Sequence, residues 1–253
     1  MRKRRIETGT EEKDANPKLA GSGLVDCIPQ TGQCPNYCLE CYYNHPGFYR
    51  TKSESLFPPY DTPKLVRVNS GHDSNIHREY VIESTSKYKE KFYNTSLPNF
   101  DFPGPVVFTC NGRDTDFSAL IVTKNLDNVM AVRFRTNLWN LDLLYEVIAY
   151  YALKKKIPVT ITFMRYADVK NIPKEKDYLQ FYVYRKSILN EYYILDPVKQ
   201  DEVFGNYAHE LVGVCGKGSS FCRDCGRCKK LYNDWKVKRG FKAMTSVLYI
   251  NSN

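Results

Sequence analysis

The chain has 253 residues, of which 42% are hydrophobic and 26% are charged, and its formal net charge is +9 at pH 7. This composition is that of an ordinary globular protein, and the length suits one large domain, alone or with an extension. No apolar run is long enough to span a bilayer, so a membrane protein is not expected.

The chain begins with a polar, basic stretch, "MRKRRIETGTEEKDANPK". It has no apolar core, so it does not read as a secretory signal. We expect residues 1–20 to be a disordered tail and the protein to be cytoplasmic, where disulfides are rare.

Short apolar runs alternate with polar and amphipathic segments along the next part of the chain. The run "GLVDCIP" at 23–29 ends at a proline and predicts a first strand. The helix at 140–156 is predicted from apolar residues at helical spacing, with Asn140 as its cap. Further strands are predicted within 64–74, 104–114, 128–137, 159–163 and 191–197, and another helix at 78–92. This alternation predicts an α/β fold.

Seven of the nine cysteines fall into two groups, one near each end of the chain. Clustered cysteines in a reducing compartment more often bind metal or do redox chemistry than form disulfides. The first group is Cys34, Cys38 and Cys41, spaced C-x3-C-x2-C. Three thiolates on a four-iron cube leave one iron open, and an open position is where a metal centre does chemistry.

The second cysteine group has four members in a C-x6-C-x2-C-x2-C pattern: Cys215, Cys222, Cys225 and Cys228. Four thiolates complete a [4Fe–4S] cube, and the C-x2-C-x2-C core is a bacterial ferredoxin spacing. Structural zinc usually pairs two C-x2-C knuckles across a longer gap, so iron–sulfur is favoured over zinc. The remaining Cys27 is predicted to be a strand residue, with an alternate metal ligand as the other reading, and Cys110 is predicted to be a core residue first and a substrate-side group second.

The first cysteine group resembles the signature of the radical S-adenosylmethionine (radical SAM) superfamily. Tyr42 follows Cys41 directly, whereas the family usually carries an aromatic just before the third cysteine, where this chain has Glu40. The resemblance implies that Cys34, Cys38 and Cys41 hold a catalytic [4Fe–4S] cluster whose open iron chelates SAM. It also implies an external electron donor and a 5′-deoxyadenosyl radical that takes hydrogen from a substrate.

The resemblance also implies a fold and a set of cofactor contacts. The expected fold is a partial (β/α)6 TIM-like barrel over residues 21–200, followed by a small cluster-binding extension over 201–253. In this family SAM is contacted by residues after the strands, which gives Ser70, Gly71 and Asp73 after the second predicted strand. By the same reasoning Asn111 follows the third predicted strand and Arg135 lies on the fourth, and Tyr42 is also a candidate contact.

The basic region "CRDCGRCKKLYNDWKVKRGFK" at 222–242 interleaves lysine and arginine with aromatic residues. Such a pattern contacts nucleic acid, or it is simply a solvated face, and the sequence leaves both open. The sequence therefore predicts a monomeric radical SAM enzyme with two [4Fe–4S] clusters, acting on a nucleic acid or a peptide. Whether it is an oxidoreductase or a transferase stays open. The alternative is a non-enzymatic zinc or iron–sulfur protein that binds nucleic acid.

Overall fold

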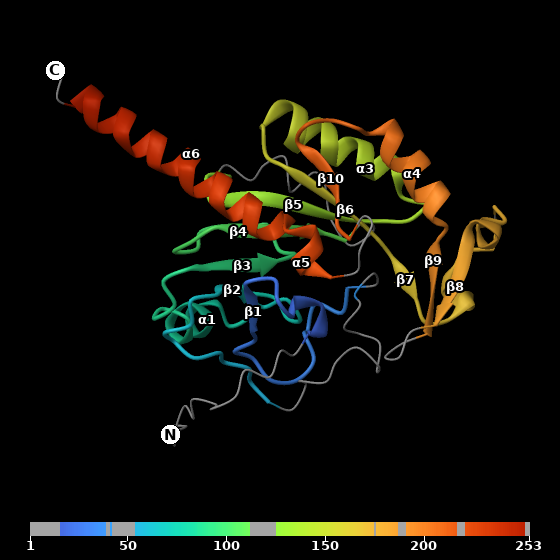
Figure 1. Cartoon of the computed structure of the whole chain (residues 1–253), viewed down its shortest axis with the longest axis horizontal. Coiled ribbons are helices and arrows are strands. Elements are labelled where there is room, and N and C mark those ends of the chain that lie inside the picture. Colours follow the sequence, from blue (N-terminus) through green and yellow to red (C-terminus); the bar gives the residue numbers. More distant parts are fainter. Residues whose placement is uncertain are drawn as a thin grey trace.

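A computed structural model of the chain describes residues 16–38, 41, 54–111, 125–174, 176–186, 191–216 and 221–250, with side chains described to residue 240. Within these residues the protein is built on a large parallel sheet and a small antiparallel one (Figure 1). The predicted α/β class is confirmed.

The large sheet has seven strands in the described part of the chain, and every neighbouring pair is parallel. They are β1 (Leu24–Cys27), β2 (Leu65–Val68), β3 (Lys91–Thr95), β4 (Val106–Cys110), β5 (Val129–Thr136), β6 (Val159–Phe163) and β10 (Val212–Val214). Their spatial order follows the chain order without reversal, with β1 and β10 at the two edges. The sheet is therefore open, and all its carboxyl ends meet along one edge.

The two faces of the large sheet are covered by different helices. One face packs against α1 (Arg78–Ser84), α3 (Leu141–Val147) and the π-helical turn η4 (Ile148–Lys154), and forms the main apolar core. Cys27 and Cys110 lie in this core with no exposed surface, as predicted. Strand side chains alternate between faces, so both faces of a parallel sheet must be covered.

The opposite face is crossed by the long C-terminal helix α6 (Arg227–Ile250), which Figure 1 draws in red in front of the strands. Leu231 and Tyr232 of α6 pack on a second apolar cluster that includes Leu24, Phe92 and Val107 of the sheet. The remaining short helices are η1 (Pro17–Leu19), η5 (Val169–Asn171), η6 (Tyr178–Phe181), α4 (Pro197–Asn206) and α5 (Cys222–Cys225). The C-terminal region thus belongs to the packing of the sheet.

The helix predicted at 78–92 is wrong in its second half. α1 ends at Ser84, and the Thr85 hydroxyl donates back to the carbonyl of Val81. The chain then enters β3, where Phe92 and Tyr93 are buried on opposite faces of the sheet. Two adjacent side chains can be buried on opposite faces only in a strand, where side chains alternate with a period of two, and a helix does not provide this alternation.

The strand predicted at 191–197 forms, but it lies outside the parallel sheet. It is β9 (Glu191–Leu195), which pairs antiparallel with β7 (Arg165–Tyr166) and β8 (Tyr182–Lys186). A parallel crossover needs a dozen or more residues, and the gap between β8 and β9 is far shorter. The place beside β6 is taken instead by β10, which lies within the predicted extension 201–253.

The helix predicted at 140–156 forms as α3 followed by η4, with a different role for its first polar residue. Asn140 makes no side-chain cap to the helix. Its side chain accepts from the backbone N–H of Asn137 at 2.9 Å and donates to the carbonyl of Arg135 at 2.9 Å. Asn140 therefore fixes the carboxyl end of β5.

Candidate functional site

The first cysteine group lies in the segment that follows β1, at the carboxyl edge of the large sheet. Cys34, Cys38 and Cys41 are all half-buried. The backbone N–H of Tyr37 donates to the Cys34 carbonyl at 3.5 Å, and that of Cys41 to the Cys38 carbonyl at 3.1 Å. Two successive turns therefore hold the three thiols on one short segment.

Asp73 ties this segment to the ends of β2 and β3. One carboxylate oxygen accepts from Asn36 Nδ2 at 3.1 Å and from the backbone N–H and hydroxyl of Ser96 at 2.6 and 2.8 Å. The other accepts from the backbone N–H of Asn75 at 2.9 Å and from Thr95 Oγ1 at 2.7 Å. Because protein donors already occupy both oxygens, Asp73 acts on its surroundings by positioning them.

Ser96 carries this network to a cysteine. Its hydroxyl lies 3.8 Å from Cys38 Sγ, within reach of a sulfur hydrogen bond. Burial raises the pKa of Cys34 to about 11, with Asp73, Cys38 and Cys41 adding smaller effects in the same direction. The Cys34 thiol is thus protonated at neutral pH, and a metal must displace its proton to bind.

The predicted SAM contacts follow several strands of the same sheet. Ser70 is half-buried, and its hydroxyl is a buried group without a hydrogen-bond partner among the described residues. Gly71 is buried beside it. Asn111 directly follows β4, and Arg135 lies near the end of β5, so both belong to the carboxyl half of the sheet. Tyr42 lies outside the described residues.

A row of polar side chains runs across the face of the sheet that α6 crosses. Most of its members lie two residues beyond an apolar member of the second cluster, and Thr160 bonds to Arg227 of α6. Arg135 and Thr162 lie two residues beyond Arg133 and Thr160, so strand alternation places them on the same face. This polar row consists of Asp26, Arg67, Asn94, Thr109, Arg133, Arg135, Thr160 and Thr162. Buried parallel strands are normally apolar throughout, so a polar row inside them marks a candidate site.

Two features of the polar row are unusual for a protein interior. Asp26 and Arg67 form a two-pronged ion pair at 2.7 and 3.2 Å while remaining 2% and 8% exposed. Asn94 Oδ1 and Thr162 Oγ1 are buried and have no hydrogen-bond partner within the residues that the structure describes. Unsatisfied buried groups are costly, and they are often explained by a bound group.

The second cysteine group lies against this polar row. Cys215 directly follows β10, Cys222 and Cys225 begin and end α5, and Cys228 lies in the first turn of α6. Gly226 joins α5 to α6 with a φ of 59°, a conformation that favours glycine.

Electrostatic effects show which groups surround these thiols. Burial raises the pKa of Cys222 to about 11, the Arg67 charge opposes the rise, and Cys228, Cys215 and Cys225 add to it. Cys215 keeps an exposed surface, yet the protein packed around its thiol raises its pKa, and the Arg133 charge opposes this. The four cysteines therefore lie in the same region as two arginines of the polar row, although, among the residues described, no three of these thiols are within metal-binding distance of one another.

Two further basic residues lie near the second cysteine group. Arg227 donates from Nε to Thr160 Oγ1 at 2.8 Å and from Nη2 to the Val159 carbonyl at 3.0 Å. Burial lowers the pKa of Arg227, and the neighbouring cysteine charges oppose the fall. Burial also lowers the pKa of Lys18 to about 8, while Cys215 and Cys222 act to raise it. Positive charge on this side suits a centre made of several thiolates.

Sequence reasoning found the cysteines but missed the groups around them. Within the described residues, no three histidine, cysteine or acidic side chains are close enough together to hold a metal ion. Metal binding by either group thus stays a prediction. The missed groups are Lys18, Asp26, Arg67, Ser96 and Arg227. Asp26 and Arg67 had a readable signal, because they are charges inside otherwise apolar strands.

Comparisons with protein-family models, with curated proteins and with solved structures found no match to this chain. Among the described residues, no helix combines the length and apolar character that crossing a bilayer requires.

Proposed function

We propose that the protein is a radical SAM enzyme with a second iron–sulfur centre. One observation carries the proposal: a C-x3-C-x2-C segment follows the first strand of a parallel sheet whose strands keep chain order. Ligands in barrel-type α/β folds gather at the carboxyl ends of the strands, where this segment lies.

We infer that the large sheet is a partial barrel of the radical SAM kind. In doubly wound sheets the strand order reverses near the middle, whereas here β1 lies at an edge and the order runs on to β6. Sequential order is what a barrel requires. The polar row then belongs to the interior of the barrel, with α6 lying across it.

In this proposal Cys34, Cys38 and Cys41 hold the catalytic [4Fe–4S] cluster. When bound, the cluster would supply an electron, received from an external donor, that splits SAM into methionine and a 5′-deoxyadenosyl radical. The residues of the chain bind and orient: Ser70, Gly71, Asn111 and Arg135 face SAM, and Asp73 positions the cysteine segment. The buried Ser70 hydroxyl has no hydrogen-bond partner in the part of the chain that the structure describes, which supports this assignment.

The second cysteine group holds a further [4Fe–4S] cluster in this account. A cube held by four thiolates carries net negative charge, and the neighbouring Lys18, Arg67, Arg133 and Arg227 offset it. Its closed ligand shell favours electron relay or a structural role over SAM binding. The substrate is a nucleic acid or a peptide, and the chemistry of the site does not choose between them.

Anaerobic reconstitution with iron and sulfide, followed by SAM and dithionite, tests the proposal. The parent protein is expected to bind about eight irons, about four in each cube, and to form 5′-deoxyadenosine. Cys38→Ala should abolish that product and leave about four irons. Cys110→Ala is the matched control, because this buried thiol lies outside both groups. Product formation by Cys38→Ala rules the assignment out.

The second candidate is a non-enzymatic zinc protein that binds nucleic acid. The four cysteines that end β10, bound α5 and begin α6 favour it, since four cysteines also complete a zinc site. It predicts zinc in protein purified in air and no 5′-deoxyadenosine under any reducing condition.

A further inference from the structure

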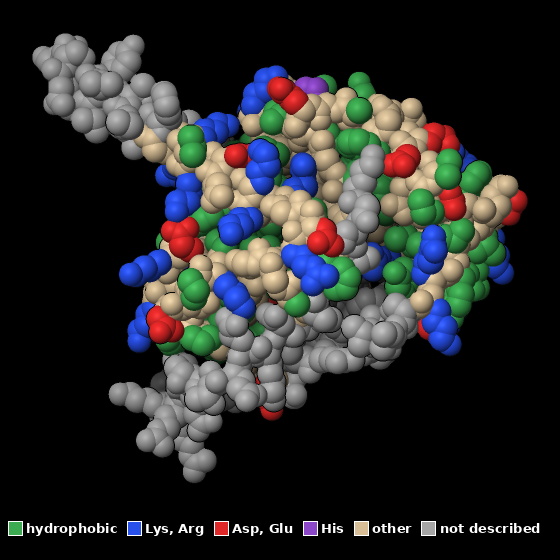
Figure 2. Space-filling view, in the orientation of Figure 1, with side chains coloured by type: hydrophobic (Ala, Val, Ile, Leu, Met, Phe, Trp, Pro, Cys, Tyr) green, Lys and Arg blue, Asp and Glu red, His purple; other side chains and the backbone are tan. Residues whose placement is uncertain are grey.

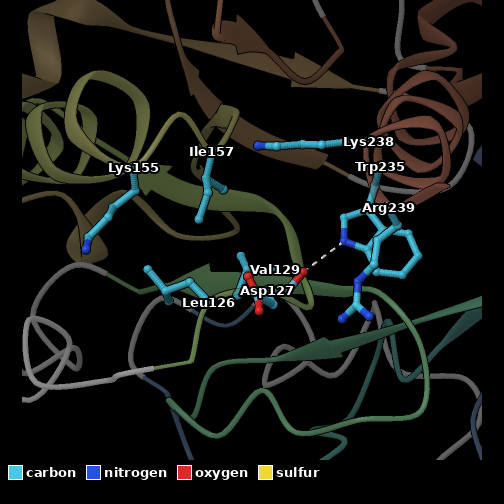
Figure 3. A pocket seen from close by; sticks show the side chains of 8 residues that line it. All are labelled: Leu126, Asp127, Val129, Lys155, Ile157, Trp235, Lys238 and Arg239. Atoms are coloured by element: carbon cyan, nitrogen blue, oxygen red, sulfur yellow. Dashed lines mark hydrogen bonds between the residues drawn. The ribbon is translucent and has the colours of Figure 1, made fainter. Parts of the chain in front are cut away.

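A cavity of about 280 Å³ lies between α6 and the strands it crosses (Figure 3). Leu126, Val129 and Ile157 line it from the strand side, where Val129 and Ile157 belong to the main core, and Trp235 lines it from α6. The indole N–H of Trp235 donates to the carbonyl of Asp127 at 3.2 Å, which holds the ring at the rim. The cavity therefore has one aromatic side on α6, and most of its remaining lining is polar.

This cavity is remote from the first cysteine group. Val129 is the first residue of β5, and Ile157 lies just before β6, so the cavity is at the amino ends of these strands. The first cysteine group and the predicted SAM contacts follow carboxyl ends instead. The length of β5 alone puts about 25 Å between the two ends.

The charged residues that line the cavity are mostly basic. Lys155, Lys238 and Arg239 contribute three cations, and Asp127 contributes one carboxylate. Among the described residues, no ion pair joins Lys155 or Lys238 to an acid, whereas Lys236 of the same helix pairs with Glu90 at 2.8 Å. The Arg239 guanidinium lies 5.3 Å from the centre of the Trp235 ring.

We propose that this cavity is a docking site for single-stranded nucleic acid. One base lies against Trp235, and the flanking phosphates contact Lys155 and Lys238. Figure 2 shows that basic side chains gather over the region around α6, so a charged backbone can continue beyond the cavity. A cavity with an aromatic ring between cations suits a base joined to phosphates better than an acidic peptide, because every base has a face that stacks.

The structure corrects the sequence view of which aromatics serve such a site. Tyr232 is only 5% exposed and packs on the sheet, so it does not meet a ligand. Phe241 lies beyond the described side chains. Lys155, which lies outside the basic region at 222–242, joins the site through the fold.

Fluorescence anisotropy of labelled single-stranded RNA and DNA of about 12 nucleotides tests the proposal on the full, metal-loaded protein. The readout needs neither SAM nor a reductant, so it stands apart from the proposed enzymatic activity. Replacing Lys155 and Lys238 together by alanine should weaken binding about tenfold. The slope of log K against log salt should become shallower by about 1.4, the value for two lost phosphate contacts.

A double variant elsewhere supplies the control for net charge. Lys174→Ala with Lys176→Ala removes two exposed cations from the segment between β7 and β8. Its salt slope should match that of the parent. Equal losses in both double variants, or no binding by the parent, overturn the proposal.

The base contact is tested with an abasic oligonucleotide of the same length. The parent should prefer the base-containing strand by at least fivefold, a modest value for one stacked base. Trp235→Ala should remove that preference. Equal affinity of the parent protein for the two oligonucleotides would contradict a nucleic-acid site. Displacement of bound RNA by a polyglutamate chain of equal charge would contradict it as well.

Discussion

The Asp73 carboxylate joins three separate parts of the chain: its own turn after β2, the end of β3 and the first cysteine segment. Buried carboxylates that accept several hydrogen bonds hold their surroundings rigidly, because each donor would be left unsatisfied without them. The geometry of the cysteine segment thus depends on a residue that need not touch a metal.

Asp73→Asn should therefore lower the free energy of unfolding by about 2 to 3 kcal/mol, since an amide nitrogen cannot accept from Ser96. Urea denaturation measures this change, and iron content should fall at the first cysteine group. Asp101→Asn is the control, because Asp101 is 87% exposed and should change stability by no more than about 0.5 kcal/mol. Equal effects of the two substitutions would contradict a positioning role.

Gly213 leaves room for Arg227, and a side chain at 213 would overlap the guanidinium group. Gly213→Ala should lower the free energy of unfolding by about 1 to 3 kcal/mol, because Arg227 must leave Thr160 and Val159. A double-mutant cycle with Arg227→Ala measures the coupling. We expect the double variant to be no less stable than Arg227→Ala alone, and additive losses would contradict this explanation.

Single residues differ in how far the sequence predicts them. The cysteine groups stand out because their spacing is local. Asp26 and Arg67 are readable as charges within the apolar runs "LVDC" and "LVRV", but their pairing depends on the register of β1 and β2. The link from Asp73 through Ser96 to Cys38 is a tertiary arrangement that no spacing indicates.

At the level of elements, α6 has a definite inward face. Leu231 is 8% exposed and packs on the sheet, whereas Val237 on the same helix is 68% exposed. Leu231→Ala should lower the free energy of unfolding by about 2 to 4 kcal/mol, because it leaves a cavity between helix and sheet.

Val237→Ala, measured in the same urea titrations, should cost no more than about 0.5 kcal/mol. If both variants lose equal stability, α6 does not pack through Leu231, and the covering of the polar row by this helix is wrong.

Strands with clear apolar runs were predictable, whereas strands defined by their partners were not. β1, β2, β4, β5 and β6 fall within their predicted segments. β3 follows α1 after only a few residues, so its alternating strand pattern is hard to separate from the helical pattern before it. β10 has only three residues and gains its place by pairing with β6. β9 has a strand pattern, but the short gap to β8 decides that it joins the antiparallel sheet.

At the scale of the whole molecule, the second cysteine group is close to the sheet. The sequence predicts it in a small cluster-binding extension over 201–253. Instead, Cys222 and Cys228 pack on the apolar cluster of the sheet, and Arg227 bonds to β6. The polar row therefore faces the second group, while the first group lies at the carboxyl edge of the same sheet.

The central claim is that the first cysteine group leaves an iron open for SAM. Electron paramagnetic resonance of the anaerobically reconstituted, dithionite-reduced protein tests it most directly, in a variant with Cys222 and Cys225 replaced by alanine so that only the first group is observed. We predict a [4Fe–4S] signal that changes when SAM is added and is lost in Cys38→Ala. A signal that SAM leaves unchanged, or no iron at this group, would contradict the account.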